Sequence, residues 1–208
     1  MATGYLKHRI TIGGDTLLMH NGQTADPLNK YAKAMKAITS DRQRKKTDEG
    51  IQELMRVEYE AGLYLNAKGQ VILPSRILEA HISEAARKTK EGKSALAGMF
   101  VDTDGLLEYE GGPLTVKQLL DSEDHRLTVP VCVNQSRVIR TRPLFHNWQT
   151  TFEVSILEEM VSSSSLKIWI ENGGNFVGLG DYRPRYGRYE LRKFEVVAAP
   201  KKGLKVAA

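Results

Sequence analysis

Hydrophobic and polar residues alternate along Tyr5–Ile12, with the period of two that a half-buried β-strand requires. The pattern predicts a strand there, and Gly13-Gly14 is expected to end it. Later segments rich in β-branched and alternating apolar residues predict three more strands, over Val131–Arg142, Asn147–Leu157 and Arg188–Val197. The short link at 143–146 is expected to join the first two of these into a long antiparallel pair, with Val131–Arg142 opposite Thr151–Leu157.

In other segments the apolar residues recur every three or four positions, as they do on one face of an α-helix. Ser75 begins the clearest of these helices, which should stop at Gly92. Ser162–Ser165 supplies capping residues for a second helix, which should stop at Gly173. Two further helices are expected nearer the N-terminus, over Leu28–Ile38 and from Thr47 or Asp48 to Tyr59.

The main elements follow one another as strand, helix, strand, strand, helix, strand. This is the order of the ferredoxin-like (RRM-like) α+β fold with an antiparallel sheet. We expect a single domain over residues 1–208. Two segments fall outside this scheme and are interpreted as long insertions, at about 26–62 and about 92–130. The second insertion contains acidic sequence with short strands at Met99–Val101 and Leu106–Tyr109.

Charge narrows the classes of partner. The chain carries 30 Lys and Arg against 25 Asp and Glu, a net charge of +5, which permits an anionic partner without requiring one. A single cysteine excludes an intramolecular disulfide and a cysteine-based metal cluster, and no histidines stand at ligand spacing with a carboxylate. We therefore expect neither a metal nor a cofactor. With no apolar run of membrane-spanning length and no signal-peptide core, we expect a cytoplasmic protein without a membrane partner.

A glycine-rich loop near the C-terminus carries the strongest functional pattern. Gly173–Tyr189 combines glycines with three arginines and three tyrosines. Glycines let backbone N–H groups approach a phosphate, arginines donate two hydrogen bonds to phosphate oxygens, and tyrosine rings stack on bases. This combination favours contact with a nucleic-acid backbone. The alternative is a tight loop into the last strand whose arginines are ordinary solvated charges.

Three segments together resemble the RAMP superfamily, in particular the backbone subunits that polymerise along the guide RNA of CRISPR effector complexes. Ile10–His20 is similar to the family's first strand and the turn after it, and Gly69–Ala80 is similar to the entry into its first helix. Gly178–Gly187 resembles the family's glycine-rich loop before the last strand. The chain departs from the family pattern at Ser75-Arg76, where glycine and serine are usual, and in the Arg-Pro-Arg-Tyr-Gly end of the loop.

The resemblance implies a non-catalytic subunit that binds single-stranded RNA, with DNA as the alternative. Its other partners would be copies of itself in an open head-to-tail oligomer, and other effector subunits. The residues expected to contact nucleic acid come from the loop, the helix entry, the long hairpin and the first turn. They are Gly178, Gly180, Tyr182, Arg183, Arg185, Tyr186 and Arg188; Ser75 and Arg76; Arg137, Arg140 and Arg142; and His20 and Asn21. Strand alternation places Arg140 and Arg142 on one face of the hairpin and Arg137 on the other.

Two other functions stay open at this point. One is a ribonuclease of the same fold that cleaves its target with Asp26 or His20, as some RAMP subunits do with a loop aspartate. Against it, Asp26-Pro27 is better explained as the start of the next helix, with Pro27 in its first position. The other is a structural or interaction protein whose basic loop has no role in binding nucleic acid.

Overall fold

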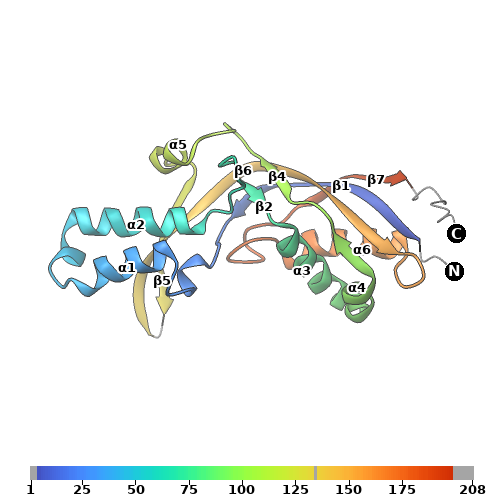
Figure 1. Ribbon diagram of the computed structural model, residues 1–208, viewed down its shortest axis with the longest axis horizontal. Coiled ribbons are helices and arrows are strands. Elements are labelled where there is room, and N and C mark those ends of the chain that lie inside the picture. The colour runs from blue at the N-terminus through green and yellow to red at the C-terminus, as the bar shows by residue number, and fades with distance from the viewer. Residues whose placement is uncertain (1–3, 134, 199–208) are drawn as a thin grey trace, which may run out of the picture.

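An antiparallel sheet runs through the computed structural model, which describes residues 4–133 and 135–198 (Figure 1). Its neighbouring strands follow the order β2-β4-β6-β1-β7, and β3 and β5 pair with other parts of β6. The strands are β1 (Tyr5–Leu18), β2 (Ile72–Leu73), β3 (Met99–Val101), β4 (Gly105–Glu108), β5 (Arg126–Val133), β6 (Ser136–Leu157) and β7 (Glu190–Ala198).

The helices occupy two regions of the molecule. Figure 1 shows α1 and α2 beside β5 at one end, and α3, α4 and α6 under the sheet at the other. The α-helices are α1 (Lys30–Ser40), α2 (Asp48–Gly62), α3 (Ser75–Ala86), α4 (Gly92–Gly98), α5 (Val116–Asp121) and α6 (Ser163–Asn172). Short turns of other helix types are η1 (Gln23–Ala25), η2 (Arg44–Lys46), η3 (Arg87–Thr89) and the π-helical η4 (Gly173–Val177).

The predicted ferredoxin-like fold is confirmed. Its six elements are β1, α3, the β3–β4 segment, β6, α6 and β7, and the strands lie in the order β4-β6-β1-β7. Apolar residues of α3 and α6 pack on one face of the sheet and bury both tryptophans, Trp148 and Trp169. The predicted caps also form, because the Thr47 and Ser162 hydroxyls accept the N–H groups of Gly50 and Ser165 at 3.1 and 3.0 Å.

The predicted pairing of Val131–Arg142 with Thr151–Leu157 is wrong. Residues 136–157 form one continuous strand of 22 residues, β6, whose first part pairs with β5 and whose second part pairs with β1. Pro143, interpreted as part of a turn, lies inside the strand where β6 passes from one partner to the other. A proline has no N–H to donate, and the Pro143 carbonyl accepts the N–H of Met19 at 2.9 Å.

The second core strand lies in a segment that was expected to be an insertion. Within 92–130, β3 pairs with β6 through Met99 opposite Ile156, and β4 pairs with it through Leu106 opposite Thr151. The expectation is therefore wrong for 99–108, although both short strands were anticipated. Their shortness and the acidic turn between them gave no long alternating pattern to recognise.

The predicted end of the first strand at Gly13-Gly14 and the predicted end of the helix at Gly92 are both wrong. Strand β1 continues past Gly13-Gly14 to Leu18, and these glycines let other parts of the chain approach it closely. A Cβ at Gly14 would lie 2.1 Å from the Arg188 carbonyl oxygen. Helix α3 ends at Ala86, and Gly92 begins α4 instead of ending α3. Among the described residues, no helix has the length and apolar character needed to span a bilayer.

Candidate nucleic-acid interface

The glycine-rich loop is held at the end of β1 by backbone hydrogen bonds. The Gly187 N–H donates to the Thr16 carbonyl at 2.8 Å, and the Asp181 N–H donates to the Leu18 carbonyl at 2.7 Å. Gly180 and Gly187 have φ of +89° and +76°, and a Cβ at either would lie 2.3 or 1.7 Å from a backbone oxygen. The glycines therefore serve close packing within the protein. The N–H of Gly178 likewise donates inside the chain, to the Gly173 carbonyl, so it is already occupied.

The three arginines of the loop differ in their surroundings. Arg183 forms an exposed ion pair with Glu84 of α3 at 2.9 Å, and the Arg188 Nε donates to the Pro184 carbonyl at 3.1 Å. Arg185 is exposed and forms no ion pair with the described part of the chain. Exposed pairs such as Arg183–Glu84 contribute only about 0–1 kcal/mol, so a phosphate can compete for this guanidinium.

Exposed aromatic rings surround these arginines. Tyr182 and Phe176 are 65% and 64% exposed, and the rings of Tyr182 and Tyr186 lie 6.0 Å apart. Phe176 and Tyr182 line a pocket of about 470 Å³ together with Lys88. Phe176 was not among the predicted contacts, although its place in the glycine-rich segment was a usable signal. The described surface thus offers base-sized rings beside cationic side chains.

Two hairpin arginines are tied to the loop through carboxylates. Arg140 and Arg142 both pair with Glu58 of α2, at 3.0 and 3.3 Å, and the Arg142 Nε also donates to Asp181 of the loop at 3.2 Å. Glu58 is buried and accepts the N–H of Thr141 at 2.8 Å. This network fixes the ribbon of β5 and β6 relative to the loop.

His20 lies between this network and the loop. It lines a pocket of about 180 Å³ with Arg140 and Arg142, and another of about 230 Å³ with Gly180 and Arg183. Partial desolvation and then the charge of Arg142 lower its pKa, so the ring is predominantly neutral at pH 7. The structure therefore brings together several of the predicted contacts, which we call the loop surface: His20, Arg140, Arg142, Gly180, Tyr182 and Arg183.

Other predicted contacts are engaged elsewhere. The Ser75 N–H, at the start of α3, donates to the Asp104 carboxylate at 2.7 Å, so a side chain occupies the place proposed for a phosphate. Asn21 donates to the Leu63 carbonyl at 3.2 Å, beside the C-terminus of α2. Arg76 lies over the Tyr64 ring at 5.8 Å. Arg137 lies opposite Cys132 in the ribbon, outside the pockets that define the loop surface.

Asp26, the candidate cleavage residue, forms a local turn. Its carboxylate accepts the N–H of Leu28 at 2.9 Å, and Asn29 caps α1 through the N–H of Tyr31. The expectation that Pro27 occupies the first helical position is wrong, since α1 begins at Lys30. The Asp26 carboxylate therefore stabilises the turn that precedes α1.

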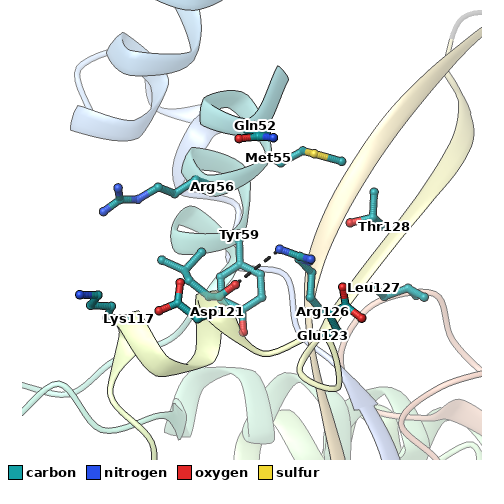
Figure 2. A pocket seen from close by; sticks show the side chains of 11 residues that line it. Gln52, Met55, Arg56, Tyr59, Lys117, Asp121, Glu123, Arg126, Leu127 and Thr128 are labelled. Carbon is teal, nitrogen blue, oxygen red and sulfur yellow. Dashed lines mark hydrogen bonds between the residues drawn. The ribbon is translucent and has the colours of Figure 1, made fainter. Parts of the chain in front are cut away.

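A broad pocket of about 770 Å³ lies away from the loop surface, between α2, α5 and β5 (Figure 2). Figure 2 shows that charges of both signs line it, among them Arg56, Lys117, Asp121 and Arg126. One Arg126 guanidinium nitrogen donates to the Leu120 carbonyl at 3.5 Å. This mixture of charges does not favour an anionic strand.

The face of the sheet opposite the helices, which we call the outer face, is polar and largely self-neutralised. Arg9 pairs with Glu153 at 2.8 Å, and Lys193 pairs with Glu195 at 2.9 Å. Between them, the hydroxyls of Thr11 and Thr151 lie 2.9 Å apart. The centre of this face therefore presents hydroxyls and paired charges, and its exposed rings, Tyr5 and Phe100, lie beside the start of β1.

Comparison with known proteins gives a match in structure alone. No family model matches the chain. A search of curated proteins gives no match. Among solved structures, the fold is similar to a chain in the cryo-EM structure of the Type III-B Cmr-beta bound to cognate target RNA, with a TM-score of 0.56 and 10% sequence identity. The match covers 93% of this chain and 61% of the other, so the present chain spans less than two thirds of its neighbour's length.

Proposed function

We propose that this protein binds single-stranded RNA as a RAMP-like subunit of a CRISPR-effector-like ribonucleoprotein. One observation carries the proposal: residues from three separate segments meet at the loop surface, where arginines lie next to exposed aromatic rings and pockets. The fold supports it, because the similar chain belongs to an assembly bound to target RNA. Single-stranded DNA is the alternative ligand.

The charges at the loop surface support binding to a phosphate backbone. Arg140, Arg142 and Arg183 of this surface, and Arg185 two residues further along the loop, are accompanied by three carboxylates, of Glu58, Glu84 and Asp181, and Glu58 pairs with two arginines at once. Phosphate oxygens accept charge-assisted hydrogen bonds from guanidinium groups, and binding releases counterions from the strand. Arg183 and Arg185 are the arginines that contact the RNA most directly, because both are exposed.

Tyr182 and Phe176 act as stacking platforms for bases next to the bound phosphates. Their exposure, 65% and 64%, leaves the ring faces accessible, and each stacked base contributes about 1–3 kcal/mol. Stacking of this kind tolerates every base, so it accounts for binding with little sequence preference.

Successive subunits assemble head to tail along the strand in an open oligomer. The two regions seen in Figure 1, with the β5–β6 ribbon and α1–α2 at one end and α3, α4 and α6 at the other, offer different surfaces for a heterologous contact. Electron microscopy with RNA strands of increasing length should show arcs that lengthen with the strand. Particles of constant size would contradict this assembly.

The test of binding is fluorescence anisotropy of a labelled single-stranded RNA across a salt series. The variant Arg183→Ala/Arg185→Ala should weaken binding and reduce the log–log salt slope by about 1.4, or about 0.7 for each phosphate contact. The matched control, Arg9→Ala/Lys193→Ala, removes the same charge from the outer face and should leave the slope unchanged. If the control loses the slope and the first variant keeps it, the strand binds the outer face instead. Absence of binding by the wild-type protein would reject the proposal.

A further inference from the structure

A small pocket is enclosed by the end of β1, one face of α3 and the glycine-rich loop. Its volume is about 230 Å³. Its walls are mainly apolar and come from Leu17, Met19, Leu73, Ile77, Ala80 and Leu179. The polar lining residues are His20, Tyr64, His81, Glu84 and Arg183. An apolar hollow with a few polar groups is the usual form of a binding site for an organic ring.

His81 lines this pocket and carries a buried ring nitrogen that lacks a partner. It is 4% exposed, and its Nε2 lies 3.0 Å from the Tyr189 hydroxyl, while its Nδ1 has no hydrogen-bond partner among the described residues. Burial raises the pKa of Tyr189, so its hydroxyl stays protonated and can donate to Nε2. With the Tyr189 hydroxyl as donor, the His81 proton resides on Nδ1, and this nitrogen is buried with no surface open to the pocket.

The rest of the chain is built to hold this pair in place. A Cβ at Gly173 would lie 2.8 Å from His81 Nε2 and 2.4 Å from the Tyr189 hydroxyl oxygen, so the pair fits only beside a glycine. Burial, followed by the charge of Arg183, lowers the pKa of His81 to about 4, and the ring is therefore neutral at pH 7.

The size of the pocket limits its occupant. At about 230 Å³ it is smaller than the ~300–1,000 Å³ typical of sites for drug-sized ligands, so it suits one planar ring system and not a whole nucleotide. Arg183 and His20 lie at the same pocket and belong to the loop surface. A strand whose phosphate contacts Arg183 would thus carry its base at the pocket.

We infer that this pocket receives one unstacked base of the bound strand, which packs on the apolar walls with its polar edge toward His20, Tyr64 and Arg183. This inference rests on the proposed RNA binding and adds base selectivity at one position to it. Unstacked bases of single-stranded RNA are commonly read by such contacts. Contacts to the phosphates and stacking on exposed tyrosines do not depend on the identity of the base. Contacts in this pocket do.

The experiment compares labelled 12-nucleotide strands of adenosine, cytidine and uridine on wild-type protein and on Ala80→Phe. Ala80 is an exposed residue of α3 that lines the pocket, so a phenylalanine there obstructs it without a cavity in the core. Wild-type affinities should differ by about tenfold between the best and worst strand, and the variant should reduce this difference to about twofold with an unchanged salt slope. The control Ala97→Phe, on exposed α4 sequence, should keep the tenfold difference.

A further measurement separates the possible failures. Photocrosslinking with 4-thiouridine strands should attach the base to Tyr64 or to a neighbouring residue of the pocket. Equal affinity for all strands, or selectivity that survives Ala80→Phe, would overturn the base pocket and leave RNA binding intact. Loss of RNA binding by the wild-type protein itself would reject both proposals.

Discussion

The outer face and the loop surface both carry arginines and carboxylates, yet they offer a nucleic acid very different surroundings. On the outer face the charges pair across and along neighbouring strands, as in Arg9–Glu153 and Lys193–Glu195. Next to the loop surface, Arg185 is exposed and forms no ion pair with the described residues, and the rings of Tyr182 and Tyr186 lie alongside. The two surfaces therefore differ in how completely their arginines are paired, and the proposed RNA binding depends on this difference.

The rigidity of the loop should produce the largest effect. Gly187→Ala places a Cβ about 1.7 Å from the Leu179 carbonyl oxygen at a φ of +76°, and we expect it to lower the free energy of unfolding by about 4–5 kcal/mol. Gly69→Ala is the matched control, because Gly69 has a φ of +75° but no atom within 4 Å of its Cβ position. It should cost only about 1–2 kcal/mol. Urea unfolding measures both, and equal losses would mean that the loop is not held by close packing.

The buried carboxylate beneath the loop surface should come next. Glu58→Ala leaves Arg140 and Arg142 without their shared partner and the Thr141 N–H without an acceptor, so we expect a loss of about 2–4 kcal/mol. Glu60→Ala, which removes an i,i+4 partner of Arg56 on the same helix, should cost less than about 1 kcal/mol. Chemical denaturation of the two variants compares them directly. A small loss for Glu58→Ala would show that the network contributes little to the fold.

The pH dependence of stability should differ between the buried His81 and the ion pairs of the outer face. The folded-state pKa of His81, about 4, lies below its ordinary value of 6.5, so the unfolded chain takes up the proton first and stability falls as the pH drops through this window. From about pH 7.5 to pH 5 this amounts to about 2 kcal/mol. On the outer face, Arg9 lowers the pKa of Glu153, so that contribution is lost only below about pH 4.5, the ordinary value. Unfolding curves of wild type and His81→Gln across this range should show the higher window disappear in the variant.

The smallest expected effect concerns the exposed carboxylate of the loop surface. Glu84→Gln releases Arg183 from its ion pair and should raise the affinity for single-stranded RNA about twofold. Glu153→Gln makes the same change of charge on the outer face and should leave the affinity unchanged. Anisotropy titrations at low salt resolve the difference. An equal rise in both variants would show that net charge, and not local pairing, governs binding.

Much of the fold was predictable because its signals are local. The caps at Thr47 and Ser162, the helical period after Ser75 and the alternation of Tyr5–Ile12 each depend on a few neighbouring residues. Strand pairing was not local. Pro143 normally indicates a turn, and only the change of partner from β5 to β1 shows why β6 can continue through it.

The candidate site was likewise predictable only in part from the sequence. The arginines and tyrosines of the loop, with Arg140 and Arg142, were identified from residue type and alternation. Phosphate contact at Ser75 was a reasonable prediction for a helix start, but Asp104, 29 residues away along the chain, already occupies that position. The orphan Nδ1 of His81 depends on Tyr189 and Gly173, far apart in sequence, and so gave no signal.

By itself the sequence determined the α+β class, the order of its main elements and the basic, aromatic character of the loop, since composition and short-range periodicity specify these properties. The tertiary structure alone decided which strands pair, which arginines are neutralised by carboxylates and which form the loop surface, and where a pocket closes around His81. The physical reason is that pairing, ion pairs and cavities depend on distances between residues remote along the chain, and these distances are set only when the sheet and its helices pack together.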